Sequence, residues 1–281
     1  MKLLQIPDGL KRKALKIADD LGDVLIDCES CYGACDLAIN EAKALGCDGI
    51  IHFGHSKLIE SDLPVEYREI REKIDLLLEK IDVKEKKIGL ISTLQFIDSL
   101  DKVKDFLEKK GKIVKIGKGR SYCGQILGCD TSSAKTIEKE VDAFLFIGSG
   151  HFHPLGLALQ TDKPVYFFNI EKNKMEDLQE LKEKFLKQRY ATIALAKDAK
   201  TFGILVSLKP GQLNLKLAKE IKKKIEAKGK KAYILIFNEI KPEKLEGLDL
   251  DCYINTACPR IAIDNRTDFK KPILNPDEIE Y

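Results

Sequence analysis

Apolar runs alternate with amphipathic helical patterns along almost the whole chain, and this alternation constrains the fold more than any other feature. It is typical of βαβ units built around a parallel sheet. The pattern of strand, loop and helix repeats three times, so we predict three similar α/β domains of residues 1–83, 84–195 and 196–281. Units of about 85–110 residues are small for independent folding. We therefore expect them to pack together around a central site with pseudo-threefold symmetry.

The same patterns predict the individual elements. Strands are expected at residues 2–6, 23–26, 49–53, 87–92, 112–116, 143–147, 165–169, 202–207, 231–237 and 252–255. Helices are expected at residues 9–21, 37–45, 66–80, 98–110, 132–141, 174–191 and 212–228. The last helix is rich in lysine, which indicates a solvated outer face.

Composition excludes several classes of protein. Among 281 residues, 48 are basic and 45 acidic, and a net charge of +3 is too balanced for a general nucleic-acid binder. No apolar stretch approaches the ~18 residues of a membrane-spanning helix. The first residues lack a signal peptide's apolar run and cleavage site. We therefore expect a cytoplasmic protein in a reducing compartment, without membrane or direct nucleic-acid partners.

Eight cysteines in such a compartment point to metal binding or catalysis rather than to disulfides. Several stand beside glycine or proline in predicted loops after strands, where ligands of parallel α/β sheets gather. Cys47 and Cys252 are instead interpreted as small buried apolar residues, and Cys123 as a bystander.

Three cysteines, Cys28, Cys31 and Cys35, fall within eight residues of the first repeat. One interpretation is a cluster held by all three, although the C-x2-C-x3-C spacing reverses that of ordinary radical S-adenosylmethionine enzymes. The favoured interpretation keeps Cys35 as the ligand and gives Cys28 and Cys31 structural roles. Gly33 would let the backbone approach a ligand closely.

The second and third repeats each offer one candidate thiolate. Cys129 follows two glycines of a predicted tight loop, and Asp130 or Thr131 can cap the helix after it. Cys258 follows a strand and precedes Pro259, which restrains the loop. Arg260 could bind a carboxylate with both arms of its guanidinium or simply lie at the surface.

A glycine-rich segment, Gly148-Ser149-Gly150-His151, follows the third strand of the second repeat. Backbone N–H groups in such a segment can bind a carboxylate. The four histidines of the chain, His52, His55, His151 and His153, all lie at the ends of third strands, which raises the chance that some line a site.

The sequence resembles the family of archaeal diphthamide biosynthesis radical enzymes, the 2-(3-amino-3-carboxypropyl)histidine synthases. The matching stretches run through nearly the whole chain in family order. They are Cys31-Tyr32-Gly33-Ala34-Cys35-Asp36, His52-Phe53-Gly54-His55-Ser56, Gly124-Gln125-Ile126-Leu127-Gly128-Cys129, Gly150-His151-Phe152-His153-Pro154-Leu155-Gly156 and Asn255-Thr256-Ala257-Cys258-Pro259-Arg260.

The resemblance implies a homodimer whose subunits each carry a 4Fe–4S cluster, bound by one cysteine per domain: Cys35, Cys129 and Cys258. It implies S-adenosylmethionine as substrate, translation elongation factor 2 as acceptor and an electron donor as a further partner. The reaction would move the 3-amino-3-carboxypropyl group to carbon 2 of a histidine imidazole. The chain begins almost at its first strand, which puts contacts made by an N-terminal extension in doubt.

We expect a small set of residues to contact S-adenosylmethionine, and two other functions stay open. The expected contacts are Gln125, Gly148, Ser149, Gly150, His151 and Arg260. The first alternative is a quinolinate-synthase-like iron–sulfur dehydratase, which would make no 5′-methylthioadenosine. The second is a non-catalytic supporting subunit, against which the presence of all three candidate ligands argues.

Overall fold

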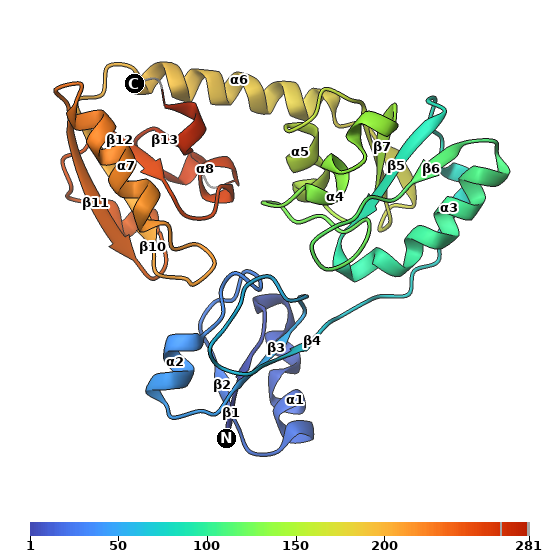
Figure 1. The fold of residues 1–281 in the computed structure, drawn as a ribbon, viewed down its shortest axis with the longest axis horizontal. Helices are drawn as coiled ribbons and strands as arrows, with labels where there is room; N and C mark the ends of the chain where they lie inside the picture. Colours follow the sequence, from blue (N-terminus) through green and yellow to red (C-terminus); the bar gives the residue numbers. More distant parts are fainter. Residues whose placement is uncertain (265, 280–281) are drawn as a thin grey trace. The chain divides into compact units, whose positions relative to one another are not determined.

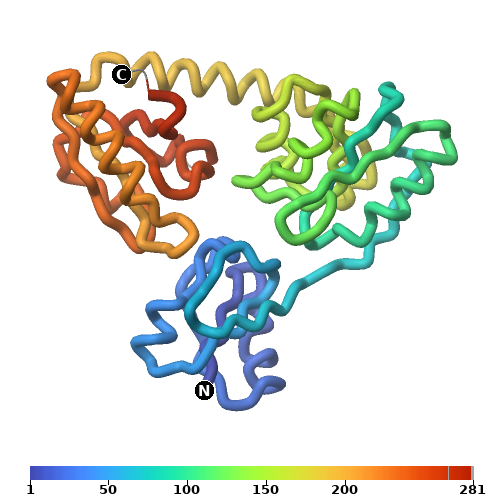
Figure 2. The backbone as a smooth tube through the Cα atoms, viewed as in Figure 1, coloured from blue at the N-terminus to red at the C-terminus, as the bar shows by residue number. Residues whose placement is uncertain are grey.

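The structure is a computed structural model that describes residues 1–264 and 266–279. The chain forms three α/β units, each built on its own sheet, as predicted (Figure 1, Figure 2). These group into two compact bodies, residues 1–34 with 38–183, and residues 35–37 with 184–281. The first body holds two sheets and the second holds the third. Domain boundaries near residues 83 and 195 stay predictions.

The first sheet has four parallel strands in the order β2-β1-β3-β4. Its aliphatic core, which includes Leu4, Ile6 and Ile51, packs against Ala14 of the first α-helix. The strands are β1 (Lys2–Gln5), β2 (Val24–Asp27), β3 (Ile50–Phe53) and β4 (Val65–Arg68), and the helices are η1 (Asp8–Lys13), α1 (Ala14–Leu21) and α2 (Ile39–Ala44).

The second sheet has the order β6-β5-β7-β8-β9, with only β9 antiparallel. Alternate residues of β7 face opposite cores: Leu145 packs on the α3 side, and Phe144 and Phe146 on the α4 and α5 side. The strands are β5 (Lys87–Ser92), β6 (Ile113–Lys115), β7 (Ala143–Gly148), β8 (Val165–Asn169) and β9 (Lys174–Glu176). The helices are η2 (Leu78–Lys80), η3 (Leu94–Ser99), α3 (Leu100–Lys109), α4 (Ser132–Lys135), η4 (Glu138–Glu140) and α5 (Phe152–Ala158).

The third sheet has four parallel strands in the order β11-β10-β12-β13. Helix α7 buries Ala218, Ile221 and Ile225 on one face and leaves most of its lysines toward solvent, as predicted. The strands are β10 (Thr201–Ser207), β11 (Lys231–Phe237), β12 (Cys252–Asn255) and β13 (Ile273–Leu274). The helices are α6 (Gln179–Ala196), α7 (Leu215–Glu226), η5 (Pro242–Leu245), α8 (Arg260–Asp264), η6 (Arg266–Asp268) and η7 (Pro276–Glu278).

The helix predicted at residues 66–80 is wrong. Val65–Arg68 pairs with β3 as strand β4, and the following residues lack a long helix. Ile74, Leu76 and Leu78 then pack into the core beside the second sheet. Ile74 and Leu76 lie two residues apart in a linker without helix, and Leu78 begins the short helix η2, so the apolar pattern was not that of a long helix.

The helix predicted at residues 174–191 begins late. Asn169 accepts hydrogen bonds from the backbone of Glu171 and Lys172, and Asn173 adopts a positive φ of 48°. These features form a tight turn that folds β9 back onto β8. Helix α6 therefore starts only at Gln179.

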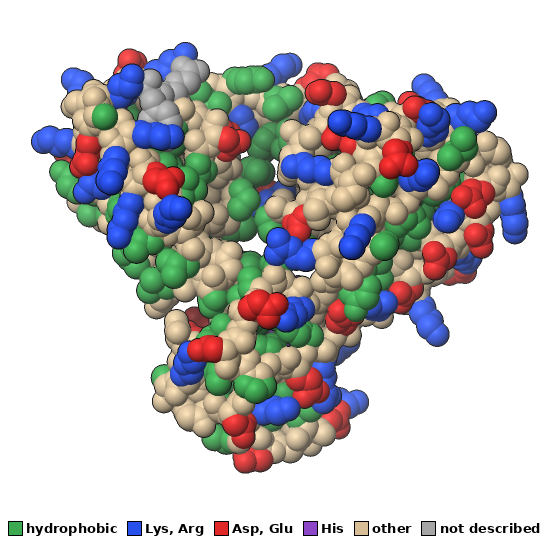
Figure 3. All heavy atoms as spheres, viewed as in Figure 1, with side chains coloured by type: hydrophobic (Ala, Val, Ile, Leu, Met, Phe, Trp, Pro, Cys, Tyr) green, Lys and Arg blue, Asp and Glu red, His purple; other side chains and the backbone are tan. Residues whose placement is uncertain are grey.

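Charged side chains of both signs intermingle over the face seen in Figure 3. This distribution agrees with the near balance of acidic and basic residues. No helix in the described part of the chain is both long and apolar enough to span a membrane.

Candidate metal centre

In all three sheets the first strand lies between the second and the third. Thus β1 pairs with β2 and β3, β5 with β6 and β7, and β10 with β11 and β12. The chain crosses first to one side and then to the other, so a crevice opens at the carboxyl ends of the strands. The candidate ligands follow strands at these edges.

Cys35 belongs to the same compact body as the third sheet. Its carbonyl accepts a hydrogen bond of 2.8 Å from the backbone N–H of Gly211, and its sulfur accepts one of 3.5 Å from Gln212 Nε2. A Cβ on Gly211 would lie 2.6 Å from the Cys35 Cβ, so only glycine allows this approach. Burial raises the pKa of the Cys35 thiol, and Asp36 raises it further, while the Gln212 hydrogen bond opposes them.

Cys258 follows β12 and is half-buried. Its carbonyl accepts a hydrogen bond of 2.8 Å from Asn255 Nδ2, and Asn255 Oδ1 accepts one of 3.2 Å from the Ala257 N–H. Because Gly211 follows β10 and β10 pairs with β12, Cys35 and Cys258 both lie at the carboxyl edge of the third sheet.

Cys129 lies at the corresponding edge of the second sheet and is exposed. Residues 124–126 run beside the end of β5. There the Ser92 N–H donates a hydrogen bond of 2.8 Å to the Gly124 carbonyl, and the Ser92 carbonyl accepts one of 2.9 Å from the Ile126 N–H. Asp130 then accepts a hydrogen bond of 2.8 Å from the Ser132 N–H at the start of α4. Cys129 and the other two cysteines fall in different compact bodies, so convergence of the three stays a prediction.

Gln125 is a predicted contact that the structure buries, at 7% exposure. Its Nε2 donates 3.0 Å to Ser56 Oγ, whereas its Oε1 has no hydrogen-bond partner among residues 1–264 and 266–279. A small cavity lined by Ser56, Arg120 and Asp130, among others, adjoins it. A buried acceptor without a donor is costly, and a ligand N–H would satisfy it.

The glycine-rich segment leads from β7 into α5. Gly150 has a φ of +63°, a conformation that favours glycine. The His151 Nε2 lies 2.7 Å from the Glu176 carboxylate, and the His153 ring stacks on Phe146. The two histidines are thus positioned by different neighbours.

Arg260 is buried, at 6% exposure, in the first turn of α8. Its Nε and one terminal nitrogen each donate 2.6 Å to the carboxylate of Asp264. Burial raises the pKa of Asp264, against the opposing effect of the Arg260 charge. A carboxylate ligand would compete with Asp264 for this guanidinium.

A second group of ligating side chains, Cys31, His52 and His55, brings its ligand atoms within 4.8 Å of one another and could hold a metal ion. Gln5 Oε1 accepts from His52 Nδ1 at 2.9 Å, so His52 Nε2 carries the lone pair that faces His55 Nδ1 at 2.9 Å. Burial lowers the pKa of His52 to about 3 and lowers that of His55. Burial therefore favours the neutral form of both rings.

Two of the remaining cysteines have the burial that the sequence predicts. Cys47 and Cys252 are buried, and burial raises the pKa of Cys252 to about 12. Cys28 and Cys123 are exposed. Cys35 and Cys258 are half-buried and Cys129 is exposed, and all three lie in loops that follow strands. Three thiolates are a donor set that fits an iron–sulfur cluster. Sequence reasoning missed Gly211 and Gln212, because a distant loop packed on Cys35 leaves no local signal.

Comparison with known proteins gives consistent matches over the full length. Residues 6–281 match the family described as "Putative diphthamide synthesis protein". The 2-(3-amino-3-carboxypropyl)histidine synthase of Pyrococcus horikoshii is 40% identical over 295 residues, which cover 99% of this chain and 84% of the relative.

Two solved structures share the fold at 37% identity. The crystal structure of Dph2 from Pyrococcus horikoshii superposes with a TM-score of 0.90, covering 100% of this chain and 87% of that one. A second crystal structure of the same protein, with a 4Fe-4S cluster, has a TM-score of 0.88 and covers 99% of this chain and 84% of that one. The parallel-sheet α/β architecture is therefore that of these proteins.

Proposed function

This chain belongs to the diphthamide synthesis protein family, and we propose that it transfers the 3-amino-3-carboxypropyl group of S-adenosylmethionine to a histidine of translation elongation factor 2. The observation that carries the proposal is the 40% identity to an archaeal 2-(3-amino-3-carboxypropyl)histidine synthase over 99% of the chain. The reaction breaks the bond from the sulfonium to the methionine γ carbon. It forms a bond to carbon 2 of the imidazole and releases 5′-methylthioadenosine and a proton.

We assign Cys35, Cys129 and Cys258 as the residues that would hold a 4Fe–4S cluster. Each follows a strand at a carboxyl edge, and none of the three residues is fully buried. A relative's crystal structure contains such a cluster. When bound, the cluster would supply one electron for cleavage of the sulfonium, and the imidazole adduct would give up one electron together with its proton, so that the electrons balance.

Other residues of the chain would bind and orient S-adenosylmethionine. Gln125 Oε1 would accept a hydrogen bond from an amino group of the substrate, because it is a buried acceptor. The N–H groups of Gly148, Ser149 and Gly150 would donate to the carboxylate, with His151 beside them. Arg260 would join them only where the substrate carboxylate displaces Asp264.

We further propose a homodimer that works in the cytoplasm and takes electrons from a separate donor. These three statements rest on the family resemblance. A sedimentation measurement on the anaerobic, iron-replete chain tests the dimer, which predicts twice the 31.7 kDa mass.

The decisive experiment is an anaerobic reaction of the dithionite-reduced, iron-replete chain with S-adenosylmethionine, with and without elongation factor 2. We expect 5′-methylthioadenosine as the dominant nucleoside and a mass increase on the elongation factor. Dominant 5′-deoxyadenosine would contradict the assigned bond cleavage. Absence of any cleavage product would favour a dehydratase or a supporting subunit.

A further inference from the structure

The loop that carries Cys258 and the short helix α8 after it are held by side chains that hydrogen-bond to their carbonyl groups. Asn255 Nδ2 donates 2.8 Å to the Cys258 carbonyl, and Asn275 Nδ2 donates 3.3 Å to that of Pro259. Arg189, in helix α6, donates 2.7 Å to the carbonyl of Ala262. Carbonyl positions fix peptide planes, and the planes on either side of a Cα limit its φ and ψ and hence the direction of its Cα–Cβ bond. These contacts therefore restrict the backbone from which the Cys258 side chain projects.

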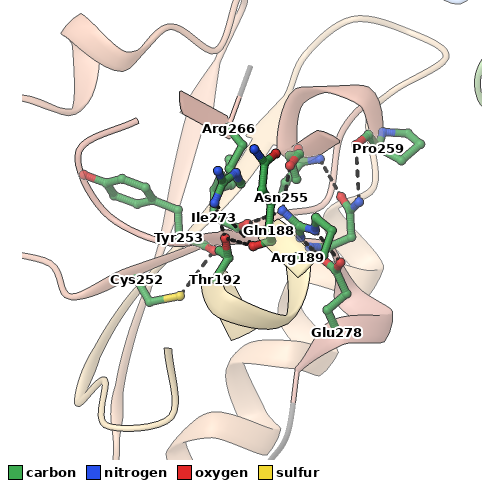
Figure 4. A network of polar contacts seen from close by, with 12 residues as sticks. Gln188, Arg189, Thr192, Cys252, Tyr253, Asn255, Pro259, Arg266, Ile273 and Glu278 are labelled. Carbon is green, nitrogen blue, oxygen red and sulfur yellow. Dashed lines mark hydrogen bonds and ion pairs between the residues drawn. The ribbon is translucent and has the colours of Figure 1, made fainter. Parts of the chain in front are cut away.

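The three donors belong to one connected network (Figure 4). Asn255 Nδ2 also donates 3.0 Å to Asn275 Oδ1, and the Asn275 N–H donates 2.7 Å to the carboxylate of Glu278. Arg189 Nε donates 2.7 Å to the other oxygen of that carboxylate, and a second guanidinium nitrogen completes the ion pair. The route from α6 to Cys258 is thus continuous.

The network is buried, and burial makes its geometry strict. Exposure is 4% for Arg189, 1% for Asn255 and 8% for Asn275. A buried ion pair contributes little net stability compared with apolar packing, so its value here lies in directional contacts. One guanidinium serves the Glu278 carboxylate and the carbonyls of Ala262 and Ile273 together. A lysine ammonium lacks the planar, forked set of N–H donors and cannot hydrogen-bond to all of these separate acceptors in the same geometry.

We propose that Arg189, acting through Glu278, Asn275 and Asn255, is a positioning residue that orients the Cys258 thiolate for the cluster. This inference rests on the proposed role of Cys258 as a ligand. Partners that orient metal ligands change metal affinity by on the order of tenfold to a hundredfold when removed.

The test uses the full chain, reconstituted with its cluster under anaerobic conditions. Arg189→Lys is the main variant, and Glu278→Gln is the milder one, since the Glu278 side chain is 18% exposed and should tolerate substitution. The matched control is Thr192→Val, one turn along the same helix. Thr192 is buried and contacts Arg266 and Gln188, but it lies outside the route to Cys258.

We measure the rate of iron loss to a chelator, the EPR spectrum of the reduced cluster and the thermal midpoint of each variant. The expected result is iron loss faster by roughly tenfold or more in Arg189→Lys and Glu278→Gln, with altered g values. Thr192→Val should keep the native spectrum and release rate even where its midpoint falls.

Two outcomes separate this inference from the proposed function. Native release rates and spectra in folded Arg189→Lys or Glu278→Gln, while Cys258→Ala loses iron, overturn the positioning role alone. Full iron retention in Cys258→Ala overturns the ligand assignment itself. Iron loss in Thr192→Val equal to that of the network variants would reduce Arg189 to a structural role, which also overturns the proposal.

Discussion

Replacing Gly211 with alanine should displace Cys35, because the structure leaves no room for a methyl group between them. The new Cβ would lie 2.6 Å from the Cys35 Cβ, 2.7 Å from its Cα and 2.8 Å from its carbonyl oxygen. Ordinary carbon contacts begin near about 3.5 Å, so the two segments must separate by about 1 Å. Overpacking of this kind costs about 1–3 kcal/mol.

The separation also strains the 2.8 Å hydrogen bond from the Gly211 N–H to the Cys35 carbonyl. We therefore expect Gly211→Ala to lower both the thermal midpoint and the iron bound after anaerobic reconstitution. Gly9→Ala is the matched control, since its added Cβ would meet nothing within 4 Å. A Gly211→Ala chain with native iron content and native midpoint would refute the packing of Cys35 on this loop.

Three further changes have distinct expected outcomes. Cys129→Ala should lose most bound iron while Cys47→Ala, at a buried site, keeps it; equal iron in both, measured after anaerobic reconstitution, would exclude Cys129 as a ligand. Gln212→Ala removes the N–H donor to the Cys35 sulfur and should make the cluster harder to reduce. A reduction potential, measured by potentiometry, that is unchanged or higher in this variant would contradict the role of Gln212. His52, whose pKa falls to about 3 on folding, binds its proton more readily when unfolded. The free energy of unfolding should therefore fall as pH drops from about 6.5 toward 3, by up to about 1.4 kcal/mol per pH unit. Urea titrations at pH 7 and pH 5 should show a smaller loss of unfolding free energy in His52→Gln than in the unchanged chain.

The central strands of each sheet were predictable because burial on both faces makes their sequences almost continuously apolar. β7 is the clearest case, with every residue of Ala143–Gly148 buried. The edge strand β4 was not predictable in the same way. Its Val-Glu-Tyr-Arg sequence has polar residues and runs into a segment with helical composition, and only pairing with β3 reveals it.

The candidate cysteines could be selected from the sequence because glycine and proline mark the loops that hold them. Their surroundings could not. Gln212 lies 177 residues from Cys35, and Arg189 lies 89 from Glu278. Arg260 illustrates the limit from the other side: its predicted carboxylate partner exists locally as Asp264, four residues along the same helix turn. A motif can show that a guanidinium fits a carboxylate, but it cannot show which carboxylate is already present.

The three candidate ligands do not occupy equivalent places in their units. Cys35 follows the second strand of its sheet, β2, and Cys129 likewise follows β6, before helices α2 and α4. Cys258 instead follows the third strand, β12, and leads at once into the short helix α8. A loop that follows a different strand of the sheet meets different neighbours. The side chains of Asn255, Asn275 and Arg189 hold three carbonyl groups of the Cys258 loop and of helix α8. The buried network therefore supports the one candidate ligand that follows a third strand.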